Sequence, residues 1–289
     1  MEEEKIRKEV REGYAKIAKE GLCCGSTASS CDSSVTHEEM SKKIGYTSKE
    51  LQSVPEGANL SLGCGNPVAL ASLKEGETVI DLGSGAGIDC FLAAKRVGEK
   101  GKVIGVDMTS EMIDKARENA KKGNYGNVEF RLGEIENLPV ADNTADVIIS
   151  NCVINLSPNK KRVFEESFRA LKPGGRLMVS DIVLLKELSD AIKKRAHPCS
   201  CVQGAIMKDE YLETIEQAGF HNVKITEEKQ HSFEDVVNDP TARVVVASPN
   251  KDTKELKHVS ELEEEAKEIV KETLASTTSI NVSAIKPSK

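Results

Sequence analysis

The sequence predicts an α/β protein with a doubly wound, mostly parallel sheet of seven strands. Strand-like and helix-like segments alternate between residues 78 and 181, and the expected strands are short apolar runs. The first of these runs leads directly into a glycine-rich turn that is followed by a helical segment. Such alternation is typical of parallel strands joined by crossover helices. With 289 residues, the chain is long enough to bury a sizeable core as one large domain with appendages.

The expected strands follow the apolar runs. Five parallel strands are expected at residues 79–82, 103–106, 128–132, 145–150 and 177–180. Two later runs, 223–226 and 243–247, flank a charged loop and are expected to add an antiparallel hairpin.

The chain divides into three expected parts. Residues 1–70 are expected to form helices and a cysteine-rich loop that pack on the active site. Residues 71–249 are expected to form the cofactor-binding domain, with an insertion around residues 195–206. Residues 250–289 are expected to be a charged helical or disordered tail, because the apolar residues from 256 to 274 mark one face of a charged helix and the Ser/Thr-rich end has no core-forming pattern.

The first part begins with helical signals. Apolar residues recur at helical spacing from Ile6 to Ile17, whereas residues 21–34 are rich in Gly, Ser and Cys and have no periodicity. Thr36 and Glu39 have the spacing of a capping box, which predicts a short helix that ends at Gly45.

Composition excludes several classes of partner. The formal net charge is −7, so the chain has no basic footprint for nucleic acid. No apolar run approaches the roughly 20 residues that span a bilayer, and the first eight residues are too charged for a signal peptide. We therefore expect a cytoplasmic, monomeric protein without membrane contacts. Eight cysteines in that compartment favour reactive or ligating thiols over a disulfide framework.

The glycine-rich turn predicts a ligand site. Gly83, Gly85 and Gly87 alternate with other residues, and their lack of side chains lets the backbone approach a ligand closely. The helix that follows presents unpaired N–H groups. The spacing is not the G-x-G-x-x-G of dinucleotide sites. Asp81 precedes the turn, and an acid there suits a ligand with a positively charged end.

Two further acids follow later strands. Asp107 ends the second expected strand about 20 residues past the last glycine, where a ribose-binding carboxylate is expected. Gly133 and Glu134 follow the third. The glycine turn after Asp81, the acid Asp107 and the pair Gly133–Glu134 occur in the order found in the class I S-adenosylmethionine-dependent methyltransferases, and the chain resembles this family. The Pro-Gly-Gly turn at 173–175 before the fifth strand also resembles that family. The resemblance implies a Rossmann-like sheet of seven strands.

The same resemblance implies where the cofactor binds. Asp81 would orient the amino acid portion through the glycine turn, Asp107 the ribose hydroxyls, and Glu134 with Ile135 the adenine. The complete set of implied cofactor-binding residues is Asp81, Gly83, Gly85, Gly87, Asp107, Met108, Glu134, Ile135 and Asn151.

Three cysteines are placed to meet at the cofactor site. Cys152 follows the fourth strand, at the edge of the sheet where ligands bind. Cys64 lies in a second glycine turn before the sheet, and Cys201 lies in the insertion after the fifth strand. Three converging thiolates would bind a thiophilic ion, and trivalent arsenic, with its pyramidal three-sulfur complexes and its lone pair, meets that requirement.

The cysteine motifs make the resemblance more specific. The segments Gly-Cys-Gly-Asn-Pro at 63–67, Ser-Asn-Cys-Val-Ile-Asn at 150–155 and Cys-Val-Gln-Gly-Ala at 201–205 resemble those of the arsenite methyltransferases. In that family Cys152 and Cys201 would hold arsenic, while Cys64 would join in binding or form a transient disulfide. Cys23, Cys24 and Cys31 compete for the role of an amino-terminal accessory thiol, and we favour the Cys23–Cys24 pair. Leu62 stands where some members have an aromatic residue.

The implied reaction needs few protein groups. The arsenic lone pair attacks the sulfonium methyl in line, so the protein mainly holds the two centres together, and no general base is required. The substrate would be arsenite or its thiol conjugates, the methyl donor S-adenosylmethionine and the reductant thioredoxin or glutathione, with no metal cofactor.

Other interpretations remain. The chain could methylate an organic small molecule, with incidental cysteines, or bind metalloids without catalysis. His197, Cys199, Cys201 and His221 could form a zinc site, although their spacing matches no standard zinc knuckle. Cys90 is expected to be a small buried residue.

Overall fold

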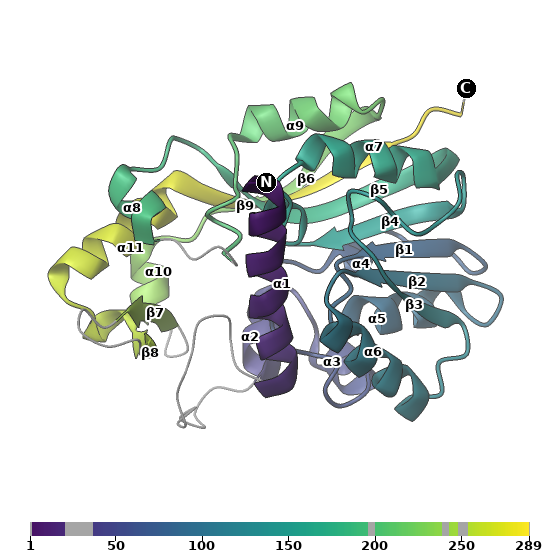
Figure 1. The fold of residues 1–289 in the computed structure, drawn as a ribbon, viewed down its shortest axis with the longest axis horizontal. Helices are drawn as coiled ribbons and strands as arrows, with labels where there is room; N and C mark the ends of the chain where they lie inside the picture. The colour runs from purple at the N-terminus through teal and green to yellow at the C-terminus, as the bar shows by residue number, and fades with distance from the viewer. Residues whose placement is uncertain (1, 21–36, 196–199, 239–242, 248–253, 289) are drawn as a thin grey trace.

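The computed structural model describes residues 2–20, 37–195, 200–238, 243–247 and 254–288. A seven-stranded sheet in the order β3-β2-β1-β4-β5-β9-β6 forms its centre (Figure 1). The strands of this sheet are β1 (Thr78–Leu82), β2 (Lys102–Asp107), β3 (Val128–Leu132), β4 (Ala145–Asn151), β5 (Leu171–Leu184), β6 (His221–Lys229) and β9 (Thr277–Ile285). Strands β1 to β5 pair in parallel, and β9 is antiparallel to both β5 and β6.

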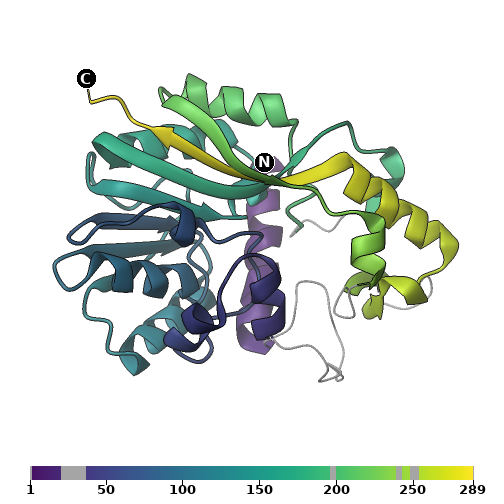
Figure 2. The ribbon, with the colours of Figure 1, turned by 180° about the vertical axis from the view of Figure 1, so that it is seen from behind.

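Helices surround this sheet. The helices are α1 (Glu2–Glu20), α2 (His37–Lys43), α3 (Ser48–Ser53), α4 (Pro67–Leu70), α5 (Ile88–Val97), α6 (Ser110–Lys122), α7 (Lys160–Ala170), α8 (Asp190–Arg195), α9 (Lys208–Gln217), α10 (Phe233–Asn238) and α11 (Glu264–Ser276), with 3-10 turns η1 (Ile154–Leu156) and η2 (Val259–Glu261). In both Figure 1 and Figure 2, α1 lies between the main sheet and a smaller group formed by α8, α10, α11, β7 and β8.

The inner strands are apolar because both of their faces are covered. In β1, Ile80 and Leu82 face one core, which includes Phe164 of α7 and Tyr211 of α9. Val79 faces the opposite core, which α5 and α6 cover. Parallel strands covered by helices on both sides read as continuous apolar runs rather than as an alternating pattern. The five expected parallel strands and the amino-terminal helix are confirmed.

The short helices near the amino terminus differ in one detail from expectation. Helix α2 forms as expected, and Gly45 follows it with φ +104°. The expected capping residue Thr36 lies outside the described residues. A complete capping box begins α3 instead, where Thr47 and Glu50 bond each other's backbone N–H groups.

The last strand of the sheet corrects the sequence expectation. The segment from Thr277 to Ile285, expected to be part of a tail, is β9 and lies between β5 and β6. Its apolar residues Ile280, Val282 and Ala284 alternate with Ser, Thr and Asn, and all three are buried. Among the polar residues of the strand, Thr277, Thr278 and Asn281 are buried, whereas Ser279 and Ser283 are partly exposed. The Ser/Thr-rich composition concealed the alternation of the three apolar residues.

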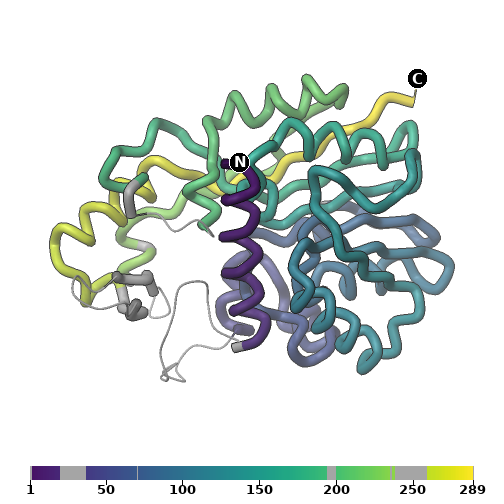
Figure 3. Tube along the Cα trace, viewed as in Figure 1, coloured from purple at the N-terminus to yellow at the C-terminus, as the bar shows by residue number. Residues whose placement is uncertain are grey.

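The run at Arg243–Ala247 also has a different partner from the one expected. This run is β7, and it pairs with β8 (Lys254–His258) in a separate two-stranded sheet. The expected helical face therefore begins later, because residues 254–258 are a strand and α11 starts at Glu264. Figure 3 shows the yellow end of the chain running back from α11 along the sheet.

Among the described residues, no helix has the length and apolar character to cross a membrane.

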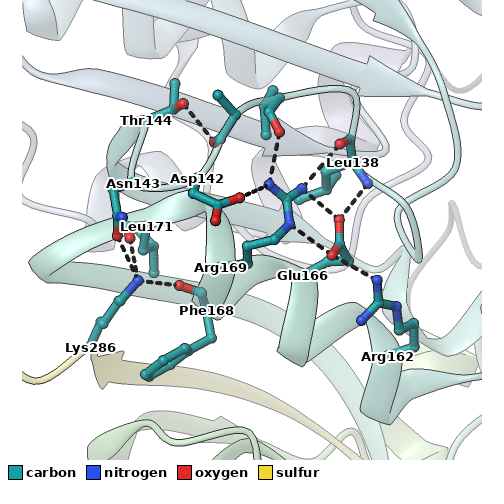
Figure 4. A network of polar contacts seen from close by, with 12 residues as sticks. Leu138, Asp142, Asn143, Thr144, Arg162, Glu166, Phe168, Arg169, Leu171 and Lys286 are labelled. Atoms are coloured by element: carbon teal, nitrogen blue, oxygen red, sulfur yellow. Dashed lines mark hydrogen bonds and ion pairs between the residues drawn. The ribbon is translucent and has the colours of Figure 1, made fainter.

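Hydrogen bonds of Lys286 fix the chain end that follows β9. Lys286 donates to the carbonyls of Phe168 and Leu171 at 2.7 Å and to Asn143 Oδ1 at 2.9 Å. Beside it, the buried carboxylate of Glu166 accepts from Arg169 at both oxygens (Figure 4). The bonds of Lys286 join the residue after β9 to the end of α7, the start of β5 and the loop before β4.

Replacing a buried residue of β9 tests its place in the sheet. Ile280→Ala removes a side chain that is 1% exposed, and we expect the free energy of unfolding to fall by about 2–5 kcal/mol. Ile285→Ala in the same strand removes a side chain that is 40% exposed and should change it by less than about 0.5 kcal/mol. Urea denaturation measures both. Equal effects would show that β9 does not pack in the core.

Candidate active site

A cavity of about 1030 Å³, including its open mouth, lies at the carboxyl ends of β1, β2 and β4. The glycine turn after β1 and the ends of β2 and β4 form one wall. Residues of α1 and the segment 58–63 form another, and Arg7, Val10 and Tyr14 of α1 reach the cavity. Ligands of open parallel sheets bind at this edge. The amino-terminal helix therefore covers part of the expected ligand site.

The glycine turn adopts a backbone that glycine favours. Gly83 has φ +67° and Gly85 has φ +50°. A Cβ on Gly83 would lie 2.4 Å from Val153, whereas one on Gly85, which lines the cavity, would meet no atom within 4 Å. The first glycine thus permits close packing of the turn on the segment after β4, and the second keeps its place at the cavity wall free of a side chain.

Asp107 is held at the cavity wall by two backbone donors. Its Oδ1 accepts from Thr109 N at 2.8 Å and its Oδ2 from Gly85 N at 2.9 Å. Burial raises the pKa of Asp107 above its ordinary value, although these bonds oppose the shift. Met108 and Ile135 line the cavity beside it. A carboxylate fixed in this way can accept from a pair of ligand hydroxyls.

Two neighbouring acids after β3 differ in their contact with the cavity. Glu136 lines it, accepts from Ser157 Oγ at 2.6 Å and lies 3.8 Å from the Arg7 guanidinium. Glu134 lies 3.7 Å from Arg7 Nε but does not line the cavity. Together these acids hold α1 over the opening through Arg7.

Asp89 rather than Asp81 faces the cavity. Asp81 is buried beneath the turn, where it accepts from Cys90 Sγ at 3.2 Å, and it is not a lining residue. Asp89 lines the cavity, accepts from Tyr46 Oη at 2.7 Å and has no ion-pair partner among the described residues. Burial raises the pKa of Asp89 to about 6. An unpaired carboxylate at a cavity wall favours a cationic ligand group.

Asn151 joins this acid to the turn that carries Cys64. Its Oδ1 accepts from Cys64 N at 2.9 Å and from Gly65 N at 3.2 Å. Its Nδ2 lies 2.8 Å from Gly65 O, 2.9 Å from Tyr46 Oη and 3.1 Å from Asp89 Oδ2. The turn closes tightly around this amide.

Three sulfur atoms meet at the edge of the cavity. Cys152, which lines it, follows β4 with φ +60° and forms a disulfide with Cys64 across a Cα–Cα distance of 5.7 Å. Cys201 Sγ lies 2.8 Å from Cys152 Sγ. Ser279 of β9 donates to Cys64 O at 3.3 Å, so the carboxyl-terminal strand helps to hold that turn. The sulfurs come from three separate segments, and a reduced site would present three thiols together.

A buried carboxyl lies beside the sulfurs. Ligand atoms of Asp181, Cys64 and Cys152 lie within 4.8 Å of one another. Tyr211 Oη donates to Asp181 at 3.1 Å, and burial raises the pKa of Asp181 to about 7. The buried ammonium of Lys160 partly offsets that shift.

Comparison with known proteins identifies the family. A family model described as a methyltransferase domain matches residues 73–219, slightly more than half of the chain. The chain belongs to this methyltransferase family. Its fold agrees, because a seven-stranded, mostly parallel sheet with an antiparallel strand pair is the class I methyltransferase fold.

Individual methyltransferases resemble the chain over most of its length. A curated arsenite methyltransferase of Halobacterium salinarum is 50% identical over 230 residues, which are 77% of this chain and 59% of that protein. The human arsenite methyltransferase is 38% identical over 183 residues, 59% of this chain and 48% of that protein. The chain thus spans about half to three fifths of the length of these curated relatives.

A solved structure gives a similar result. The crystal structure of an arsenic(III) S-adenosylmethionine methyltransferase from Chlamydomonas reinhardtii is 28% identical, with a TM-score of 0.61. The match covers 86% of this chain and 74% of that one. The similarity therefore extends beyond the methyltransferase domain itself.

Several expected residues lie away from the cavity or outside the description. Gly87 precedes α5 and does not line the cavity. Cys90 is buried, as expected. Cys23, Cys24, Cys31, His197 and Cys199 lie outside the described residues, so the accessory-thiol and zinc hypotheses stay open there. His221 is exposed on β6, and the ligand cluster found in the described part of the methyltransferase does not include it.

Sequence reasoning missed two residues that complete the cavity. Tyr46 is far from the sheet motifs in sequence, and no pattern marks it. Asp89 did carry a signal, because it lies in the first turn of the helix after the glycine loop, where an acid is favourable.

The raised pKa of Asp89 predicts a pH-dependent stability. Ionising this buried carboxyl costs free energy only in the folded state, so stability should fall as the pH rises from 3.8 to about 6. Asp89→Asn removes this titration. The free energy of unfolding of the variant, minus that of the unsubstituted protein, should therefore rise across this pH window by on the order of 3 kcal/mol. Urea denaturation at several pH values measures the difference, with the exposed Asp114→Asn as control. Parallel native and Asp89→Asn profiles would contradict the assignment.

Proposed function

We propose that the protein transfers methyl groups from S-adenosylmethionine to trivalent arsenic held by Cys64, Cys152 and Cys201. One observation carries the proposal: the three sulfur atoms meet at the edge of the cavity, and Cys152 belongs to both the sulfur cluster and the cavity wall. Soft thiolate ligands select thiophilic ions. The relatives named arsenite methyltransferases support the same substrate.

The residues of the cavity suit S-adenosylmethionine. Asp107 would accept from the ribose hydroxyls, and Met108 and Ile135 offer an apolar surface for the adenine. Asp89 would accept from the ammonium of the amino acid portion, a role that the sequence had suggested for Asp81. Each polar or apolar part of the ligand thus finds a matching group.

The cysteines would first bind the substrate. A dithiol reductant gives two electrons to the Cys64–Cys152 disulfide and leaves as its own disulfide. The three thiols then replace the hydroxyl groups of arsenite, each thiol proton leaving with a hydroxyl as water. The resulting three-sulfur arsenic retains its lone pair.

The same cysteines would restore arsenic after transfer. S-adenosylmethionine supplies a sulfonium methyl group, and as the As–C bond forms the S–CH₃ bond breaks and its electron pair stays on sulfur. The lone pair is spent, so arsenic is formally oxidised by two electrons. Cys64 and Cys152 return two electrons by leaving arsenic as a disulfide. Methylated trivalent arsenic then stays on Cys201, and a water molecule fills its open position as hydroxide and releases one proton. No general base takes part in methyl transfer, because the attacking atom carries no proton.

Each turnover then requires external thiols. We infer that thioredoxin or glutathione supplies them, because either can exchange with a protein disulfide. The cytoplasm keeps such thiols reduced, so we propose that the protein acts there, as a monomer and without a metal cofactor.

Two other functions remain as alternatives. An organic acceptor would use the cofactor cavity without the sulfurs, so methylation would survive loss of Cys152 and Cys201. A protein that binds metalloids without catalysis would not need a cofactor cavity lined by the carboxylates of Asp89 and Asp107. The continuity of cavity and sulfur cluster favours the arsenic reaction.

Arsenic speciation tests the proposal. The protein is incubated with arsenite, S-adenosylmethionine and a dithiol, and the products are separated chromatographically with arsenic-specific detection. We expect methylated arsenic from the native chain and at least a roughly 100-fold lower rate from Cys152→Ser or Cys201→Ser, since each loses an arsenic ligand.

Cys199→Ser is the matched control, two residues from Cys201, and it should retain the native rate. Methylated arsenic from Cys152→Ser at the native rate would refute the sulfur site. No methylated arsenic from the native protein, with cofactor binding confirmed by calorimetry, would favour an organic acceptor.

A further inference from the structure

We propose that Asn151 is a positioning residue that couples cofactor occupancy to the place of Cys64. This inference rests on the proposed function, because it takes S-adenosylmethionine as the cofactor. The contacts of one side-chain amide with both the Cys64 turn and the cavity wall carry it.

On one side, the amide organises the turn at residues 63–65. Asn151 Oδ1 accepts from the backbone of Cys64 and Gly65, and Nδ2 lies 2.8 Å from Gly65 O. A Cβ on Gly63 would lie 2.5 Å from Asn151 Nδ2, so the turn is packed directly on the amide. The position of Cys64 therefore depends on how firmly this side chain is held.

On the other side, the amide nitrogen of Asn151 is surrounded by more acceptor atoms than it has hydrogens to donate. Nδ2 carries two hydrogens. Three acceptors lie within 3.1 Å of it, namely Gly65 O, Tyr46 Oη and Asp89 Oδ2. As long as Asn151 is the donor to Asp89 Oδ2, one of these three contacts is without a proton at any moment, and Gly65 competes with the cavity wall for the amide.

A cationic ligand group removes this competition. Tyr46 already donates to Asp89 Oδ1 at 2.7 Å, and Asn151 is the donor that the structure gives for Oδ2. The ammonium of S-adenosylmethionine, or of S-adenosylhomocysteine, would donate to Oδ2 in its place. Both amide hydrogens then remain on Gly65 O and Tyr46 Oη, and the turn that carries Cys64 is held in the position that meets Cys152.

The coupling is measurable without arsenic. Cys64 is half-buried, so its alkylation should become faster when its turn opens. The protein is reduced with a phosphine and treated with iodoacetamide, and the modification of Cys64 is followed by peptide mass spectrometry. S-adenosylhomocysteine should slow this reaction at least about fivefold, the lower end of ordinary coupling between two sites. 5′-Methylthioadenosine lacks the ammonium and should not slow it.

Two variants separate coupling from simple shielding. In Asn151→Ala, bound S-adenosylhomocysteine should no longer slow alkylation of Cys64, with saturation confirmed by calorimetry. In Tyr46→Phe, two acceptors remain for two hydrogens, so Cys64 should react slowly even without ligand, and S-adenosylhomocysteine should add little. Faster alkylation of Cys64 in Tyr46→Phe than in the native chain would overturn the inference.

Several results would overturn the inference. If the ligand merely shielded Cys64, it would still slow alkylation in Asn151→Ala. If S-adenosylhomocysteine and 5′-methylthioadenosine slowed alkylation equally, the ammonium would have no part in the effect. Native-like behaviour of Tyr46→Phe would refute the competition for hydrogens. Failure of S-adenosylhomocysteine to bind would refute both this inference and the proposed cofactor, whereas an Asn151-dependent effect without arsenic methylation would leave the coupling intact and refute only the substrate.

Discussion

The Asn151 amide holds the Gly-Cys-Gly turn by accepting from the backbone of Cys64 and Gly65, and the arrangement of the whole site depends on these bonds. Cys64 precedes the sheet by more than a dozen residues, and its turn is held at the end of β4 by these tertiary bonds and by the disulfide to Cys152. Cys152, the residue after Asn151, supplies the central sulfur of the cluster. One strand end therefore positions both a wall of the cavity and the central sulfur of the cluster.

The sheet provides the rigidity that such a site needs. β4 lies between β1 and β5, so the glycine turn, Asn151 and the Ser180 carbonyl that accepts from Cys152 N occupy fixed neighbouring positions. β9 completes this support, since Ser279 donates to the Cys64 carbonyl and Ser180 donates to Asn281. Catalytic groups on packed strand ends are held more precisely than groups on long loops.

The electrostatics of the cavity are those of a site built for a positively charged ligand. Asp89, Asp107 and Glu136 line it, and Arg7 is the cation that reaches it from α1. Arg7 lies near Glu136, whereas Asp107 is bonded by backbone N–H groups and Asp89 by neutral side chains. Asp107 and Asp89 thus both lack a cationic partner, and Asp89 is the one that contacts Asn151, whose neighbour in the chain is Cys152.

The sequence by itself determined the parallel strands, the glycine turn and the three cysteines, because these features depend on local spacing and on buried apolar runs. It did not reveal β9, because the apolar residues of this strand stand in a Ser/Thr-rich segment and its pairing with β5 and β6 joins parts of the chain that are far apart in sequence. It assigned the cation-binding role to Asp81, but only the tertiary structure shows that Asp81 is beneath the turn and that Asp89 faces the cavity. Which of two nearby acids meets a ligand depends on the direction in which a turn leaves its strand, and packing decides that direction.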